Sequence, residues 1–251
     1  MTNAPQRAIG IDIGGTGMKA GIVDLLDGTL VSERVRIPTP KGATPRDVLS
    51  TATQLVGLLG PDAEDLPIGV CFPAVVKNGV TLSAANISDE WIGLDADGRF
   101  GEALGRDIRF VNDADAAGIA ELKFGAARDQ SGFTIMTTLG TGIGSAFLFD
   151  GKLVPNSELG HLEHNGKSIE RWASAAARER DDISWSKWAK RLQHFYDRVE
   201  ALFSPDLIVV GGGVSKNPEK FLPMIETRAP IVTAVHRNNA GIIGAASLIL
   251  G

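Results

Sequence analysis

The sequence predicts an α/β fold made of two lobes that share one recurring hairpin motif. The first copy is Gly15-Thr-Gly17, which is followed by an apolar strand and the turn Asp27-Gly28. The second copy is Gly140-Thr-Gly142, which is followed by an apolar strand and the turn Asp150-Gly151. The two copies start almost half the chain apart. Repetition at this period predicts two similar domains, each with a glycine-rich β-hairpin.

Composition excludes several classes of protein. The chain has 251 residues, of which 43% are hydrophobic and 22% charged, and its 30 glycines suit repeated turns close to a ligand. The net charge of −5 argues against general nucleic-acid binding. No apolar segment is long enough to cross a bilayer and no apolar leader precedes the first strand, so we expect no membrane partner and a cytoplasmic location. Cys71 is the single cysteine, which excludes an intrachain disulfide and a multi-thiolate zinc site.

The first hairpin has the residue types of an anion-binding loop. Its glycines let the backbone approach a ligand closely, and successive N–H groups can converge on a phosphate. Asp12 at the mouth of the loop could hold Mg²⁺ through water. A glycine-rich turn without a ligand is the alternative interpretation. The phosphate-binding residues expected here are Asp12, Gly14, Gly15, Thr16, Gly17 and Lys19.

A dinucleotide-binding motif competes for the same residues, because Gly15-x-Gly17-x-x-Ala20 fits its fingerprint. That motif needs a helix directly after the glycines. Residues 21–30 contain poor helix formers and a DG turn, which favours a second strand and argues against NAD.

The following segments alternate between strand and helix patterns. We expect strands over residues 31–37, 68–72 and 108–111, and helices over residues 46–59 and 114–124. The strand at 108–111 delivers Asn112 and Asp113 to the start of a helix. Ligands gather at the carboxyl ends of strands in α/β sheets, so Asp113 is a candidate for the residue that accepts a proton from an attacking hydroxyl. A helix cap is the alternative role for both side chains.

The second hairpin, at residues 139–144, is followed by polar side chains suited to a sugar. Its expected phosphate-binding residues are Thr138, Gly140, Thr141 and Gly142. Glu158, His161 and Glu170 could fix sugar hydroxyls by charge-assisted hydrogen bonds, with the first two on one helical face. Solvated turn residues are the alternative.

The last third of the chain predicts a long amphipathic helix, a buried strand and an apolar helix. The helix over residues 183–203 has an apolar stripe of Trp188, Leu192, Phe195, Val199 and Leu202. Beside it runs a basic stripe in which Lys187, Lys190 and Arg191 could hold the tail of an inorganic polyphosphate, although a solvated surface is equally compatible. The strand over residues 207–213 ends in glycines, and the apolar helix covers residues 239–250.

These motifs together resemble a known family. Residues 12–19, 139–144 and 209–213 resemble the two phosphate loops and the adenosine loop of the actin-like sugar kinases, which have the hexokinase/ribonuclease H-like fold. The segments 111–117, 139–142, 158–161 and 169–170, in this order, resemble the ROK sugar kinases. The resemblance implies that Asp113 is the catalytic base and that Gly211, Gly212 and Gly213 contact adenosine. The sugar-binding residues that it implies are Asn86, Asn112, Asp113, Glu158, His161 and Glu170.

One departure from the family pattern is informative. Most members carry a cysteine-rich zinc motif between the histidine and the last glutamate, whereas residues 162–169 contain no thiol. We therefore expect no zinc. The compact, zinc-less pattern is similar to the polyphosphate glucokinase branch of the family, including the glucomannokinases.

The resulting expectation is a Mg²⁺-dependent kinase that transfers a phosphoryl group from polyphosphate and ATP to the 6-hydroxyl of glucose, and also of mannose. An ATP-only hexose kinase and a non-catalytic sugar sensor are the alternatives. Residues 1–110 with 239–251 should form a smaller lobe, and residues 111–238 a larger lobe that includes the catalytic aspartate. The family resemblance also implies a homodimer.

Overall fold

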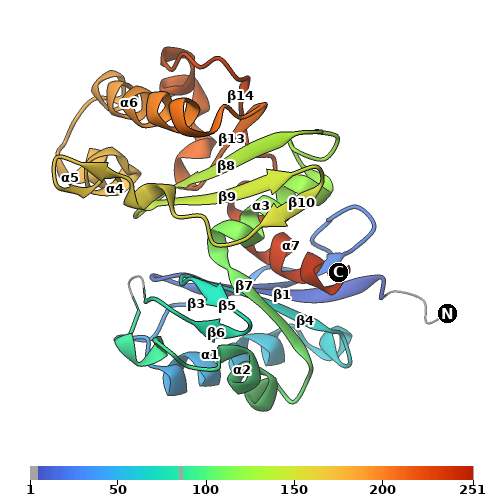
Figure 1. Cartoon of the computed structure of the whole chain (residues 1–251). Coiled ribbons are helices and arrows are strands. Elements are labelled where there is room, and N and C mark those ends of the chain that lie inside the picture. Colours follow the sequence, from blue (N-terminus) through green and yellow to red (C-terminus); the bar gives the residue numbers. More distant parts are fainter. Residues whose placement is uncertain (1–4, 85–86, 251) are drawn as a thin grey trace. The chain divides into compact units, whose positions relative to one another are not determined.

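The computed structural model describes residues 5–84 and 87–250 and divides the chain into two compact units (Figure 1). The first unit runs to Phe124 and takes up the chain again from Asn239, and the second unit is Gly125–Asn238. Both units contain a mixed sheet and helices, so the predicted α/β class is confirmed.

The first unit is built on a five-stranded sheet of order β3-β2-β1-β4-β7. β1 and β2 form the predicted antiparallel hairpin, while β4 and β7 join β1 in parallel. Because β2 is a strand and not a helix, the dinucleotide-binding alternative is excluded at this loop. The strands are β1 (Arg7–Ile13), β2 (Met18–Asp24), β3 (Val35–Ile37), β4 (Ile68–Phe72) and β7 (Ile108–Asn112), with a small hairpin of β5 (Val76–Lys77) and β6 (Val80–Thr81).

Four helices complete this unit: α1 (Pro45–Leu58), α2 (Ala96–Leu104), α3 (Asp113–Phe124) and α7 (Ala240–Ser247). Thr44 caps α1 by accepting a hydrogen bond from the N–H of Asp47. α7 packs against both β1 and α3, and it approaches them very closely. A Cβ on Gly10 would lie 1.9 Å from the carbonyl oxygen of Ile242, and one on Gly244 would lie 1.7 Å from that of Ala116. Only glycine permits this packing at either position.

An aromatic cluster forms the core on the other side of the first sheet. Trp91 is fully buried, and the centroid of its ring lies 4.5 Å from that of Phe72. Its Nε1 donates a hydrogen bond to the carbonyl oxygen of Ala43 at 2.9 Å. Phe100 and Phe110 complete the cluster. Trp91 is therefore a core side chain.

The second unit repeats the topology of the first, in the order β10-β9-β8-β13-β14. β8 and β9 form the hairpin, and β13 and β14 follow in parallel. The duplication inferred from the glycine motifs therefore extends to whole sheets. The strands are β8 (Phe133–Leu139), β9 (Ile143–Phe149), β10 (Lys152–Val154), β13 (Leu207–Gly211) and β14 (Ile231–Thr233), with a small hairpin of β11 (Glu163–His164) and β12 (Lys167–Ser168).

The helices of the second unit are α4 (Glu170–Ala173), α5 (Ala175–Arg180) and α6 (Trp185–Phe203). Ser184 caps α6 by accepting from the N–H of Lys187 at 3.3 Å. The predicted apolar stripe is buried from Trp188 to Val199, but Leu202 in the last turn is 59% exposed, and the next residue, Phe203, packs against Phe133 and Phe147 of the sheet instead. That part of the prediction is wrong.

The observed division differs from the expected lobes. The boundary falls after Phe124 and not at residue 110, because β7 pairs with β4 and α3 packs against α7. Asp113 consequently belongs to the unit of the first loop, which is the larger in residues and not the smaller.

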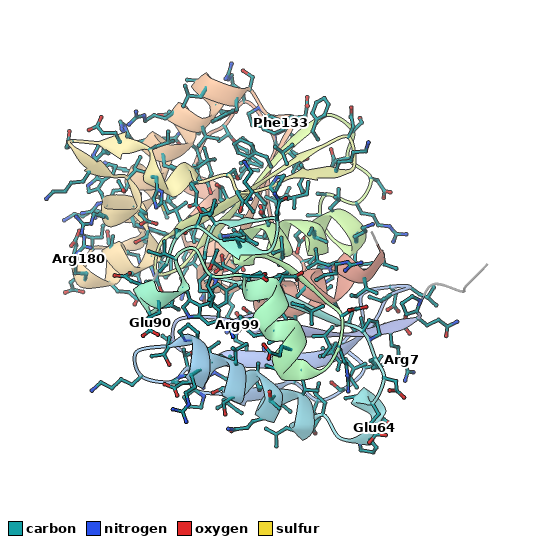
Figure 2. All side chains as sticks on the ribbon, turned by 60° about the horizontal axis from the view of Figure 1, so that its bottom comes forward. Arg7, Glu64, Glu90, Arg99, Phe133 and Arg180 are labelled. Atoms are coloured by element: carbon teal, nitrogen blue, oxygen red, sulfur yellow. The ribbon has the colours of Figure 1, made fainter. Side chains whose placement is uncertain are left out.

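Charged side chains cover the outer faces of both units. Arg7, Glu64, Glu90 and Arg99 are exposed on the first unit, and Arg180 on the second (Figure 2). No helix within residues 5–84 and 87–250 is long and apolar enough to span a membrane.

Candidate active site

The first glycine loop, residues 14–17, connects β1 to β2 at the edge where β1 ends. The N–H of Gly14 donates to the carbonyl oxygen of Gly17 at 3.2 Å, which closes the turn between the paired residues Ile13 and Met18. Gly15 and Thr16 are exposed at its tip. The tip of the loop is therefore open to solvent, where a phosphate can approach its backbone.

Asp12 and Lys19 lie opposite each other at the base of this loop and form an ion pair, with 2.7 Å between Oδ2 and Nζ. Cys71 is adjacent to Asp12 in the parallel pairing of β1 with β4, and its Sγ lies 3.7 Å from Oδ1 of Asp12. A Cβ on Gly241 would come within 2.8 Å of Cγ of Asp12, so only glycine leaves room for the carboxylate. The Asp12 side chain is thus supported from three elements.

Sequence reasoning missed Cys71 as a member of this site. Burial raises the pKa of its thiol well above the usual value, and the charges of Asp12 and Asp113 raise it further. The side chain therefore stays a neutral thiol, which can donate to Asp12 or to the carbonyl oxygen of Gly241 at 3.5 Å. Asp12 is paired with Cys71, and Cys71 with Val111, so Asp12 and Asp113 lie at the same end of the first sheet.

Arg36 is a second missed residue. It lies opposite Lys19 in the pairing of β2 with β3, and its Nη2 donates to the carbonyl oxygen of Thr16 at 3.1 Å. The side chain is exposed. The pattern of β3 gave no signal for it, because only the pairing of β3 with β2 brings this guanidinium to the loop.

Asn112 and Asp113 have different roles at the start of α3. Asn112 is 7% exposed, and its Oδ1 accepts from the N–H groups of Ala114 at 2.8 Å and Asp115 at 3.1 Å. Its Nδ2 donates to the carbonyl oxygen of Ala74 at 2.9 Å. Asn112 therefore caps the helix, and Asp113, which is half-buried and accepts from Ala114 N at 2.8 Å, is not needed for that purpose.

The second glycine loop is also closed by a hydrogen bond between two of its glycines, but it is one residue shorter than the first. The N–H of Gly140 donates to the carbonyl oxygen of Gly142 at 3.0 Å, between the paired residues Leu139 and Ile143. Thr141 is exposed at the tip, and Thr138 is half-buried at the base. A glycine-rich loop therefore joins the hairpin strands in both units, with a different turn in each.

The predicted sugar-binding residues of the second unit cluster beside this loop. Glu158 precedes the short 3-10 turn Leu159–His161, and the N–H of His161 donates to its carbonyl oxygen at 3.0 Å. Glu170, the first residue of α4, accepts a hydrogen bond at Oε2 from the N–H of Ile143 at 3.1 Å. Burial raises the pKa of Glu158, His161 lowers it, and Glu170 raises it. Oε2 of Glu170 would lie 3.0 Å from a Cβ on Gly160, so Glu170 borders the turn that carries Glu158 and His161.

The glycines after β13 lie beside the second loop. Gly211 is paired with Thr138 in the parallel pairing of β13 with β8. Gly212 has a φ of 84°, and a Cβ there would come within 2.4 Å of the carbonyl oxygen of Leu139. The segment predicted to contact adenosine thus borders the second phosphate loop.

The basic stripe on α6 is only partly available to a ligand. Arg191 donates from Nη1 to Asp181 Oδ2 at 2.6 Å and to the carbonyl oxygen of Trp172 at 2.7 Å, and its side chain is 17% exposed. Lys187 and Lys190 are exposed. The two lysines therefore remain candidates for a polyphosphate tail, whereas Arg191 holds α4 and α6 together.

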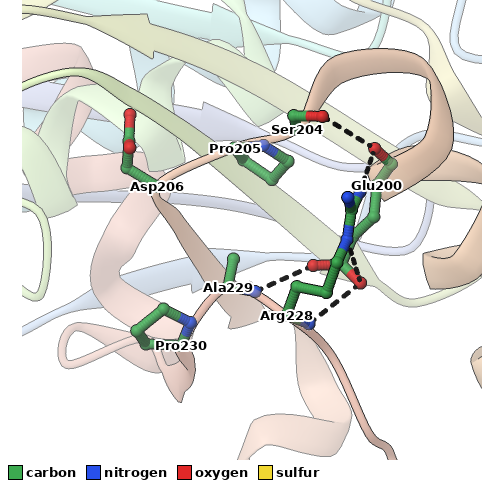
Figure 3. A pocket seen from close by; sticks show the side chains of 7 residues that line it. All are labelled: Glu200, Ser204, Pro205, Asp206, Arg228, Ala229 and Pro230. Carbon is green, nitrogen blue, oxygen red and sulfur yellow. Dashed lines mark hydrogen bonds and ion pairs between the residues drawn. The ribbon is translucent and has the colours of Figure 1, made fainter.

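A surface pocket of about 320 Å³ in the second unit contains none of the predicted residues (Figure 3). The Glu200 carboxylate accepts from the N–H groups of Arg228 at 3.1 Å and Ala229 at 2.8 Å, which satisfies it within the protein. The residues that line the pocket are Glu200, Ser204, Pro205, Asp206, Arg228, Ala229 and Pro230. We assign this pocket no part in the site.

Two further points concern the predicted site. Asn86 lies outside the described residues. Within residues 5–84 and 87–250, no three His, Cys, Asp or Glu side chains are grouped closely enough to bind a metal ion. The remaining predicted residues are divided between the units, with Asn112 and Asp113 in the first and Glu158, His161 and Glu170 in the second.

The chain is similar in sequence and in structure to several known proteins. The polyphosphate glucokinase of Mycobacterium tuberculosis is 43% identical over 242 residues, which cover 96% of this chain and 90% of that protein. The crystal structure of the inorganic polyphosphate/ATP-glucomannokinase from Arthrobacter sp. strain KM is 51% identical, with a TM-score of 0.94 over 98% of this chain and 99% of that one. The ROK hexokinase from Thermus thermophilus is 25% identical, with a TM-score of 0.77 over 96% of this chain and 97% of that one.

The family model described as the ROK family matches residues 8–171, which span the first loop, Asp113, the second loop and Glu170. The chain belongs to the ROK family.

Proposed function

We propose that this protein transfers a phosphoryl group from inorganic polyphosphate, and from ATP, to the 6-hydroxyl of glucose. The observation that carries the proposal is that Asn112 and Asp113 have different roles at the start of α3. Asn112 caps the helix, so capping does not account for the carboxylate of Asp113 at the end of the sheet that holds Asp12 and Lys19. The names of the relatives at 43% and 51% identity support the same donors and acceptor.

The chemistry requires few protein groups. The carboxylate of Asp113 accepts the proton of the 6-hydroxyl as its oxygen attacks the terminal phosphorus, and the bond from that phosphorus to the bridging oxygen of the donor breaks. The products are the sugar phosphate and either ADP or a polyphosphate shortened by one unit. Each glycine loop offers backbone N–H groups to phosphate, and Lys19 adds a cation at the first loop that stabilises charge on the phosphates.

Mg²⁺ is part of the proposal. Asp12 fits this ion because a single carboxylate, water and phosphate oxygens are a usual Mg²⁺ environment in kinases, and its side chain is 15% exposed beside the loop. When bound, the ion neutralises charge on the phosphates of the donor.

Three further parts of the proposal rest on the relatives or the family alone. Mannose is proposed as a second acceptor because of the glucomannokinase relative, and the homodimer is proposed from the family resemblance. A cytoplasmic location stays a prediction. A coupled assay of glucose and mannose against ATP and polyphosphate tests the substrates: use of ATP alone would favour an ATP-only hexose kinase, and no turnover with either donor would favour a sugar sensor.

The Asp113→Asn variant tests the catalytic assignment. We expect kcat to fall by about 1,000-fold, because asparagine cannot accept the proton. The melting temperature should stay near that of the wild type, since Asn112 keeps the cap. The matched variant Asn112→Ala should instead lose about 1–2 kcal/mol of unfolding free energy. Retained turnover in Asp113→Asn would give that residue a structural role only.

Charge reversal on α6 tests the polyphosphate groove. Lys187→Glu/Lys190→Glu should raise the KM for long polyphosphate by roughly tenfold through lost phosphate contacts, and the KM for ATP should change much less. Arg191 is left intact because its replacement would break the contact with Asp181. Lys77→Glu/Lys152→Glu, which changes exposed lysines elsewhere by the same charge, is the control. Equal effects on both donors would contradict the groove.

A further inference from the structure

The second phosphate loop and the turn that carries Glu158 and His161 share one buried contact through Glu170. Oε2 of Glu170 accepts from the N–H of Ile143, the first residue after the loop, at 3.1 Å. A Cβ on Gly142 would come within 2.3 Å of the same oxygen, and a Cβ on Gly160 within 3.0 Å. One carboxylate oxygen is therefore packed against the loop on one side and against the Leu159–His161 turn on the other.

Ser145 provides a second link between the same two segments. The side chain is 1% exposed on β9, and its Oγ donates to the carbonyl oxygen of Ser157 at 2.9 Å. The same oxygen accepts from the N–H of Leu159 at 3.0 Å and from Oγ of Ser157 at 3.1 Å. The hydroxyl therefore uses its donor and both of its acceptor positions to hold the turn against β9.

These two links leave little independent freedom to the loop and the turn. A hexose that contacts Glu158 or His161 restrains the turn, and the turn restrains Glu170 and β9. The peptide of Ile143 is then held in place, so the loop has less freedom left to lose when a phosphate chain binds. Coupling between two ligands is reciprocal, so the donor must raise the affinity for the hexose by the same factor.

We propose that Glu170 and Ser145 are positioning residues that couple hexose binding to donor binding at the second phosphate loop. This proposal rests on the proposed function, and it assigns Glu170 a role beyond a contact with the sugar. Ser145 has this role without touching either ligand.

The test measures the affinity for the non-hydrolysable ATP analogue AMPPNP with and without glucose, together with the affinity for glucose with and without AMPPNP. In the wild type, glucose should tighten AMPPNP binding by about tenfold, and AMPPNP should tighten glucose binding equally. Glu170→Ala removes the acceptor of Ile143 N and should bring both ratios close to one. Glu170→Gln keeps a carbonyl acceptor and should keep most of the coupling, even where glucose binds more weakly. Ser145→Ala should reduce the ratio as well.

Glu158→Gln is the matched control, because it weakens a sugar contact without breaking either link. It should lower the affinity for glucose while the ratio stays near the wild-type value. A wild-type ratio in both Glu170→Ala and Ser145→Ala would overturn the coupling and leave the proposed function intact. A wild type that binds AMPPNP but no hexose would overturn both.

Discussion

The two glycine loops are closed in a similar way, but they differ in length, with residues 14–17 in the first and 140–142 in the second, and in their surroundings. Each is closed by one hydrogen bond between its own glycines, of 3.2 Å in the first and 3.0 Å in the second. At the base of the first loop, the paired residues are Asp12 and Lys19. At the corresponding place in the second, they are Thr138 and Gly144, which carry no charge.

The two loops also differ in the contacts that hold them in place. The first is braced by its own hairpin, through the ion pair between Asp12 and Lys19, with Cys71 and Gly241 behind the carboxylate. The second is braced from outside, by Glu170 from a helix that follows much later in the chain. Both units therefore have a glycine-rich loop at the end of a hairpin, while the length of the loop and the charged side chains around it differ. We infer that the first loop stabilises phosphate mainly by a cation and the second mainly by backbone N–H groups.

Among the tests that compare the two loops, the largest expected effect is a loss of turnover when the cation of the first loop is removed. Lys19→Met should lower kcat/KM for both donors by about 100-fold, because it removes charge stabilisation of the phosphates. It also leaves Asp12 without its partner, so stability should fall as well. The double variant Asp12→Asn/Lys19→Met should recover stability but not turnover, and Lys77→Met is the control for an exposed lysine. Near-normal turnover in Lys19→Met would remove the proposed difference between the loops.

The second expected effect tests how the second loop is supported. Gly142→Ala places a Cβ against Glu170 and should cost about 1–3 kcal/mol of unfolding free energy through the lost hydrogen bond to Ile143. Gly140→Ala is the matched control in the same loop, since no atom lies within 4 Å of its added Cβ. Urea unfolding of the two variants checks the difference. Equal stability would show that Glu170 does not brace this loop.

The smallest expected effect is a change of stability with pH. The carboxylate at the first loop, Asp12, is paired with a cation, whereas Glu158 lies near another carboxylate, Glu170, beside the second loop. Burial raises the pKa of Glu158 above its ordinary value of 4.5, so the folded state favours the protonated form. This contribution to stability is fully present below pH 4.5 and is lost as the pH rises through the raised pKa. The wild type should therefore lose stability relative to Glu158→Gln across that interval. Urea unfolding as a function of pH measures the difference, and a gain with rising pH would contradict it.

The sequence alone determined the parts of this protein that depend on local patterns. Glycine spacing and apolar runs predicted both hairpins, the strands at residues 68–72 and 108–111, and the long amphipathic helix. These were predictable because strand and helix periodicities and turn residues are written within a few consecutive positions. The order of the motifs also led to the ROK family.

Only the tertiary structure decided which of the candidate side chains cap a helix, contact the first loop or hold two helices together. Sequence left Asn112 and Asp113 equivalent as caps, and the hydrogen bonds of Asn112 separated them. Cys71 and Arg36 joined the first loop through strand pairing, which no local pattern reveals. The sequence suggested that Arg191 is a surface cation, whereas in the structure its guanidinium forms an ion pair with Asp181 and is only 17% exposed. These assignments depend on contacts that only the folded chain makes, such as those of Asn112 with Ala74, Cys71 with Asp12 and Arg191 with Trp172. For that reason the sequence could supply the candidates but not their assignments.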